Sequence, residues 1–311
     1  MKRFVEAKQS GSFHHAWLIA GPRGVGKARF AREAATRVLA EAAGPPLRGP
    51  GLETPADHPM ARLVEASSHP DFRWIERELN EKGDALKRNI SAKQVRKLNA
   101  LFGSTPSMSP WRVVVIDSAD DLEREGANAL LKMLEEPPPN CLFLLVAHAP
   151  GRLLPTIRSR CSRLDFQALD DDAMTAVLGR ELPNAAPAEI ARLIAIADGS
   201  AGRALGYAKL DLTSVEADAL VILREGDPTN ARRSKLAQGM SSKAAAERYA
   251  SFLHLVPTLI AREARQLDGL RQLRALDAYA SARETAAIAQ RLSLDPAATV
   301  FQLGSILATV A

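Results

Sequence analysis

The chain has 311 residues, which exceeds one small hydrophobic core and suits two or three domains. Hydrophobic residues make up 46% and charged residues 25%, a globular balance that excludes a disordered chain. With 9 Phe, 3 Tyr and 3 Trp, aromatic stacking on single-stranded nucleic acid is excluded as the main activity. The net charge of +5 permits contact with nucleic acid or an acidic partner without requiring it.

The composition also bears on the compartment. Two cysteines, Cys141 and Cys161, are too few for a disulfide framework or a four-cysteine zinc site. No apolar run approaches the roughly 18 residues of a membrane helix. Glu6 and Lys8 interrupt the apolar core that a signal peptide would need. These features predict a cytoplasmic protein.

Residues 1–166 alternate strand-like and helix-like patterns, which predicts an α/β domain. Three apolar runs have the length of buried strands: 16–20, 113–116 and 142–147. Helices are predicted from Lys27 onward, after a capping box at 91–94, and over 127–134, where the prolines at 137–139 end the helix. Glu135 and Glu136, at that end, are expected to be solvated.

Strand patterns stop after Phe166. Short helices over 167–208 predict a small helical domain, and residues 209–311 predict a larger one. In the latter, apolar residues at helical spacing form a stripe on a helix that Pro257 is expected to kink: Phe252, Leu255, Val256, Leu259 and Ile260.

A glycine-rich loop follows the first strand and opens the first long helix of this domain. The segment Gly21-Pro-Arg-Gly24-Val-Gly26-Lys27 matches a P-loop, in which backbone N–H groups surround a phosphate and the lysine neutralises it. Gly21, Gly24, Gly26 and Lys27 are therefore the candidate nucleotide-binding residues.

Two positions that an ATPase needs are altered. Ala28 stands where Ser or Thr would bind Mg²⁺ through a hydroxyl. Asp117 ends the strand over 113–116, as the aspartate of a Walker B strand does, but Ser118 replaces the glutamate that would activate water. Asp120 is a poor substitute because it lies two positions further on. Together these changes predict a P-loop fold without its own hydrolysis.

Three stretches carry a resemblance to a known family: 14–27, 127–138 (Ala-Asn-Ala-Leu-Leu-Lys-Met-Leu-Glu-Glu-Pro-Pro) and 154–161 (Leu-Pro-Thr-Ile-Arg-Ser-Arg-Cys). They resemble the AAA+ subunits of the bacterial clamp loader, most closely the delta-prime type. The resemblance covers most of 12–208. It implies an AAA+ domain (1–166), a lid domain (167–208) and a helical collar (209–311).

The resemblance also implies partners and a role. The subunit would join gamma/tau and delta subunits in a five-membered ring of the DNA polymerase III holoenzyme, which opens a sliding clamp and loads it on primed DNA. Ser159, Arg160 and Cys161 match a Ser-Arg-Cys motif whose arginine points into a neighbouring subunit's ATP site. Arg158 is the nearest competitor, and a surface or fold-stabilising arginine is the structural alternative.

The sequence departs from the family pattern at several points. Residues 28–112 lack the four zinc-binding cysteines of the motor subunits, so no metal site is predicted, and His58 and His69 are interpreted as loop residues. Arg203 lies one position beyond the nucleotide-sensing arginine, and His148 replaces a polar threonine. The family's adenine-holding segment before the loop is not matched. We therefore expect no resident cofactor and at most weak nucleotide binding.

Three functions compete at this point. The leading hypothesis is a regulatory clamp-loader subunit without intrinsic ATPase. The second is an active P-loop motor, either the clamp loader's own or a related remodelling ATPase, which would need a hydroxyl at 28 and an acid at 118. The third is a simple nucleic-acid-binding protein, which leaves the P-loop and the Ser-Arg-Cys motif unexplained.

Overall fold

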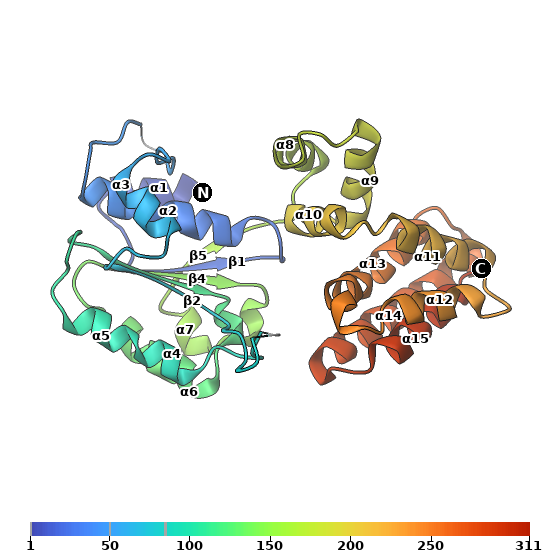
Figure 1. Cartoon of the computed structure of the whole chain (residues 1–311). Coiled ribbons are helices and arrows are strands. Elements are labelled where there is room, and N and C mark those ends of the chain that lie inside the picture. Colours follow the sequence, from blue (N-terminus) through green and yellow to red (C-terminus); the bar gives the residue numbers. More distant parts are fainter. Residues whose placement is uncertain (1, 50, 84–85) are drawn as a thin grey trace. The chain divides into compact units, whose positions relative to one another are not determined.

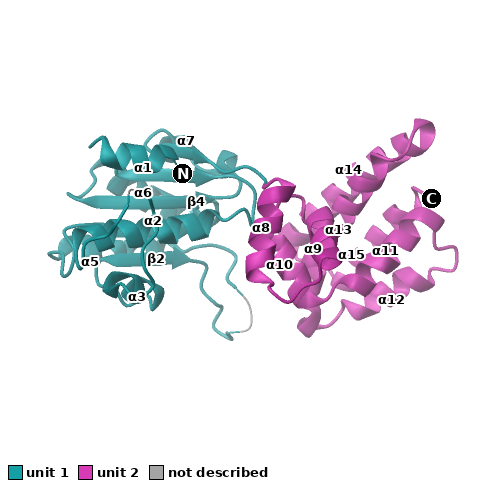
Figure 2. Cartoon of the chain, turned by 90° about the horizontal axis from the view of Figure 1, so that it is seen from above, with its two compact units in different colours: residues 1–168 teal, residues 169–311 magenta. Residues whose placement is uncertain are grey.

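The structure is a computed structural model that describes residues 2–49, 51–83 and 86–311. The chain forms two compact units, residues 1–168 and 169–311, coloured teal and magenta in Figure 2. The predicted boundary between residues 208 and 209 lies inside the second unit, and the division into three domains stays a prediction.

The first unit is built on a five-stranded parallel sheet in the order β2-β3-β4-β1-β5. Its strands are β1 (Ala16–Ala20), β2 (Phe72–Glu76), β3 (Arg112–Asp117), β4 (Cys141–Ala147) and β5 (Ser162–Asp165). Every residue of β1 and β4 is buried, as expected for inner strands covered on both faces. The predicted α/β fold is therefore confirmed for this part of the chain.

Helices cover both faces of the sheet (Figure 1). One face carries α1 (Lys2–Gln9), α2 (Lys27–Ala42) and α3 (Pro59–Glu65). The other carries α4 (Ala92–Arg96), α5 (Leu98–Gly103), α6 (Arg124–Glu135) and α7 (Pro155–Arg158). Short 3₁₀ turns, η1 (Ala119–Asp121) and η2 (Pro150–Arg152), follow β3 and β4. The two faces have separate hydrophobic cores, one around Phe143 and Leu145 and the other around Trp17 and Leu144.

The N-terminal helix α1 has no counterpart in the sequence predictions. Its fully buried Phe4 lies edge-on to Phe13, Trp17 and Phe30 at ring-centroid distances of 5.0–5.6 Å. Edge-to-face aromatic pairs of this kind stabilise a core beyond the area they bury. Phe4 therefore anchors α1 to the sheet, and Val5 and Ala7 pack against the same core.

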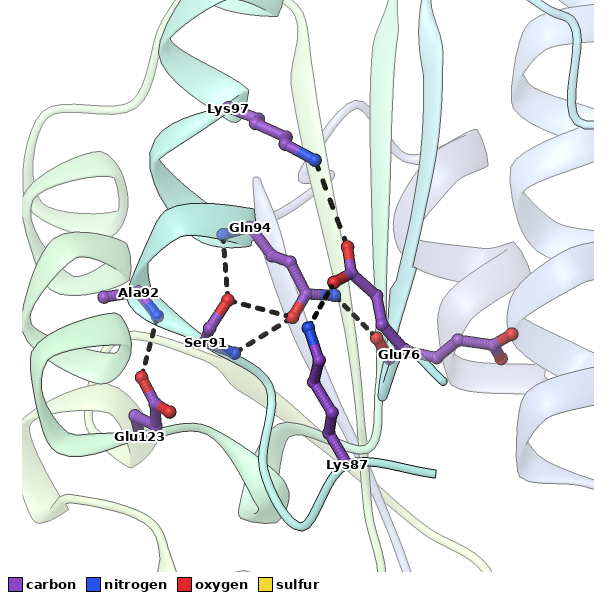
Figure 3. Close-up of polar contacts among 8 residues, drawn as sticks. Glu76, Lys87, Ser91, Ala92, Gln94, Lys97 and Glu123 are labelled. Carbon is purple, nitrogen blue, oxygen red and sulfur yellow. Dashed lines mark hydrogen bonds and ion pairs between the residues drawn. The ribbon is translucent and has the colours of Figure 1, made fainter. Parts of the chain in front are cut away.

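The predicted capping box is confirmed at the start of α4 (Figure 3). The Ser91 hydroxyl accepts from the Gln94 backbone N–H at 3.4 Å, and the Gln94 side chain accepts from the Ser91 N–H at 3.0 Å. The Gln94 amide also donates to the Glu76 carbonyl at 2.8 Å, which ties the helix to β2. The helix predicted after the box is divided at Lys97, where a three-residue turn closes between the carbonyl of Lys97 and the N–H of Ala100.

The second unit is helical, as predicted. It contains α8 (Asp171–Glu181), α9 (Pro187–Ala197), α10 (Ala201–Leu210), α11 (Thr213–Glu225), α12 (Ala231–Gly239), η3 (Lys243–Ala245), α13 (Ala246–Ala264), α14 (Gly269–Leu292) and α15 (Pro296–Ala308). The predicted stripe of α13 is buried, and it packs in one core with residues of α8, α9 and α10 such as Met174, Leu193 and Tyr207. Across the described residues, none of the helices combines the length and apolar character needed to cross a bilayer.

Candidate functional site

The P-loop lies at the carboxyl end of β1, where it turns into α2. Gly21 has φ +146°, and a Cβ at this position would lie 2.1 Å from the Phe166 carbonyl oxygen. Gly24 and Gly26 have φ +75° and +95°, in the left-handed region that favours glycine. The loop conformation and the close approach of residue 166 thus require glycines at these positions.

Lys27 is turned back onto its own loop. Its side chain is 3% exposed, and the ammonium donates to the carbonyl oxygens of Gly21, at 2.7 Å, and Pro22. Burial lowers the pKa of Lys27 to about 8, while Asp117 and Asp120 act in the opposite direction. In this arrangement the Lys27 ammonium is bonded to carbonyl oxygens of the loop and is not free to face a phosphate.

Two carboxylates meet at the carboxyl ends of β2 and β3. Asp117 lies in register with Glu76 on the neighbouring strand. Burial raises the pKa of Asp117, and the Glu76 carboxylate adds to the rise, whereas Lys27 and Arg23 oppose it. Ala28, in the first turn of α2, offers only a methyl group beside this corner. The ends of β2 and β3 thus bring two carboxylates together, and residue 28 provides no hydroxyl group.

The acids after Asp117 are engaged in local contacts. Both oxygens of Asp120 accept backbone N–H groups, from His148 at 2.9 Å and Ala149 at 3.0 Å. The Ser118 hydroxyl donates to Asp121 at 3.1 Å, and Asp121 pairs with Arg77 at 3.2 Å. These bonds orient the strand ends, so neither carboxylate is free of a structural contact.

His148 lies at the end of β4 and lines a cavity of about 250 Å³. Its buried Nδ1 has no hydrogen-bond partner among the described residues. Burial lowers its pKa to about 4, and the charges of Lys27 and Arg23 contribute. The imidazole is therefore neutral at pH 7. The cavity brings together residues from the P-loop, from the ends of three strands, from η1 and from the segment between β2 and α4: Arg23, Glu76, Arg77, Leu86, Asp117, Ser118, Asp121 and His148.

Arg160 lies at the opposite edge of the sheet from the P-loop. It occupies the turn between α7 and β5, just before β5 begins at Ser162, whereas Gly21 lies against Phe166, just after β5 ends. The strand between them spans roughly 10 Å. The P-loop and the Ser-Arg-Cys motif therefore lie near opposite ends of β5, although both belong to the first unit.

The Arg160 guanidinium has three acceptors within the chain. It donates to the Thr156 carbonyl at 3.0 Å and to the Ser159 hydroxyl at 3.5 Å, and it pairs with Glu135 at 2.9 Å. Its side chain is 36% exposed. Arg158 is exposed, and Cys161 is partly buried, with its thiol pKa raised to about 12 by burial. Cys161 is thus a packing residue, and Arg160 is accessible from outside.

The remaining candidates have structural contacts. Arg203, on α10, donates to the Ala197 carbonyl at the end of α9 at 3.2 Å. His58 accepts from the Met60 N–H and bonds to the Pro45 carbonyl, and His69 accepts from the Asp71 N–H. Within the described ranges, no three His, Cys, Asp or Glu side chains lie close enough to hold a metal ion.

A family model described as DNA polymerase III, delta subunit, matches residues 1–170. The chain belongs to this family. It is delta-prime-like: it is 35% identical over 186 residues to the delta-prime subunit of Pseudomonas aeruginosa, a match that covers 60% of this chain and 53% of that protein. It is 31% identical over 174 residues to the delta-prime subunit of Bacillus subtilis, covering 56% of this chain and 48% of that protein.

Similarity extends to a second type of DNA polymerase III subunit. The tau subunit of Bacillus subtilis is 32% identical over 179 residues, covering 58% of this chain and 29% of that protein. The chain spans about half the length of the delta-prime relatives that it matches. The resemblance inferred from the sequence is therefore confirmed at the level of the family.

Three contributors to these sites were missed in the sequence. Glu76 and Arg77 line the cavity from β2 and the segment after it, which carry no motif. Glu135 was expected to be solvated; it is 47% exposed but paired with Arg160. No sequence spacing signals this pair, because its members lie on separate elements that only the fold brings together.

Proposed function

We propose that this chain is a delta-prime-like clamp-loader subunit without ATPase activity of its own, which supplies Arg160 to the ATP site of a neighbouring motor subunit. In this proposal it joins gamma/tau and delta subunits in a five-membered ring in the cytoplasm. The ring opens a sliding clamp and loads it on primed DNA. The subunit needs no resident metal or nucleotide.

The observation that carries the proposal is the separation of Arg160 from the chain's own P-loop. Because the two lie at opposite ends of β5, any nucleotide that Arg160 reaches belongs to another chain. A guanidinium delivered in this way stabilises charge on the γ-phosphate and is worth ~10³–10⁵ in rate. The side chain is partly exposed, as such a role requires.

Substitution of Arg160 in the assembled loader tests the role. Arg160→Ala is expected to leave folding and ring assembly intact and to abolish DNA- and clamp-stimulated ATP hydrolysis at one site, measured per assembled ring. Arg160→Lys is expected to rescue poorly, because an ammonium cannot reproduce the forked guanidinium contact. Arg158→Ala, an exposed arginine two residues away, is the control and should be milder. Normal hydrolysis per ring with Arg160→Ala would end the hypothesis.

The alternative is an active motor, which the similarity to tau and the intact glycines and lysine of the loop favour. Steady-state hydrolysis by the isolated chain separates the two. We expect only background turnover, because Ala28 provides no metal-binding hydroxyl and Ser118 cannot act as a base. Turnover that disappears in a Lys27→Ala variant would establish the motor instead.

A further inference from the structure

We propose that Glu135 holds Arg160 in a parked position, bound within its own subunit, and that a nucleotide in the neighbouring subunit must displace Glu135 to engage the arginine. The inference rests on the proposed function of Arg160. Its basis is the 2.9 Å contact between the Arg160 guanidinium and Oε1 of Glu135, beside the bond from Arg160 to the Thr156 carbonyl.

The position of Glu135 is electrostatically unfavourable unless a positive charge lies beside it. It is the last residue of α6, where the exposed carbonyl groups make a negative charge unfavourable. The Arg160 charge offsets this repulsion. Leu134 of α6 and Ile157 of α7 belong to the same buried core, so α6, which ends at Glu135, and α7, which ends two residues before Arg160, are held together independently of the ion pair.

Glu136 provides a comparison within the chain. It has the same charge and is the next residue, but it lines a separate cavity with Lys132 and with residues of α4 and α5 such as Arg96 and Asn99. The pairing with Arg160 therefore belongs to Glu135 by position and is not a general property of an acidic helix end.

A carboxylate and a phosphate compete for the same donors of a guanidinium. An N–H group of Arg160 that donates to Glu135 is not available to a nucleotide, so only the unparked fraction of the subunit is competent. The apparent affinity of the neighbouring site for ATP equals the intrinsic affinity multiplied by the fraction of subunits in which Arg160 is not bound to Glu135. Both partners are partly exposed, so the pair is weak enough to exchange, and the expected factor is about 1.5- to 5-fold.

The test compares Glu135→Gln, Glu136→Gln, Arg160→Ala and the double variant Glu135→Gln/Arg160→Ala in the assembled loader. Glu135→Gln is expected to lower the ATP concentration for half-maximal hydrolysis by about 1.5- to 5-fold, with the saturated rate per ring unchanged. Relative to Arg160→Ala, the double variant should show no further change in the ATP concentration for half-maximal hydrolysis. Glu136→Gln alone should leave this concentration at the wild-type value. An unchanged or increased half-maximal concentration, or the same shift without Arg160, would overturn parking. A lower saturated rate would also overturn it, because Glu135 would then orient the arginine for catalysis.

A second measurement needs no ring. Urea unfolding of the wild-type chain, Glu135→Gln, Arg160→Ala and the double variant, each as an isolated chain, gives the coupling between Glu135 and Arg160. The coupling is expected to be about 1.5- to 5-fold in the unfolding equilibrium constant. No coupling would show that the pair does not form in solution, and parking would fail whatever Arg160 does. If the coupling is measured but Arg160→Ala hydrolyses ATP normally per ring, the ion pair forms but Arg160 has no role in the neighbouring ATP site. The proposed function and parking would then both be wrong.

Discussion

At the scale of single residues, two charged groups near the P-loop, Lys27 and Asp120, form their bonds within the chain. Lys27 donates to its own loop, and Asp120 accepts from the backbone after β4. Each of these groups would have to exchange a bond within the chain for a bond to nucleotide or metal. The local geometry is thus compatible with the proposal of a subunit without ATPase activity, whose chemical grounds are Ala28 and Ser118.

His148 makes the stability of the first unit sensitive to acid. Its pKa is about 4 in the folded chain against an ordinary value of 6.5, so between these values the unfolded chain binds a proton that the folded chain does not. Stability therefore falls as the pH decreases from 6.5 to 4, by roughly 2–3 kcal/mol from this group. In His148→Asn the fall should be smaller, measured by urea unfolding at pH 7, 5.5 and 4.5.

The exposed His254 on α13 provides the control, since His254→Asn leaves the buried imidazole in place. If wild type and His148→Asn lose stability in parallel as the pH falls, the burial of His148 does not set the acid sensitivity.

At the scale of elements, the strength of the local signal decided which helices and strands could be predicted. The inner strands β1, β3 and β4 are continuous apolar runs and were predicted. The edge strands β2 and β5 are only five and four residues long and mix buried apolar residues with exposed charged ones, so they contain no continuous apolar run. The helix α1 was missed because Phe4 is its one buried residue.

The capping box of α4 gives a prediction at this scale. Ser91→Ala removes the oxygen that accepts from the Gln94 N–H and is expected to lower stability by about 1 kcal/mol. Ser242, which precedes the 3₁₀ turn η3 without making a side-chain cap bond, is the matched control, and Ser242→Ala should change stability by less than about 0.5 kcal/mol. Urea unfolding measures both, and equal effects would show that the box does not stabilise α4.

At the scale of the whole molecule, the two units have separate hydrophobic cores. Leu144 lies in a core of the first unit and Leu259 in the core of the second, and both are fully buried. Chains with several compact units commonly unfold in more than one step. Leu144→Ala and Leu259→Ala are each expected to lower the stability of one unit by about 2–5 kcal/mol and to shift different unfolding transitions.

Calorimetry together with a probe specific to each unit would show the shifts. The tryptophans Trp17, Trp74 and Trp111 all lie in the first unit, so their fluorescence follows that unit alone. A single transition that both substitutions shift equally would contradict independent cores.

The sequence by itself determined the α/β and helical halves, the P-loop and its altered positions, and the family, because these depend on short contiguous patterns. Only the tertiary structure decided that Lys27 bonds to its own loop, that Glu76 lies beside Asp117, and that Glu135 pairs with Arg160. The last two contacts join separate elements through sheet register and helix packing, whereas the first depends on the conformation of the loop. Their geometry is set by the packed core, and no local spacing in the chain encodes it.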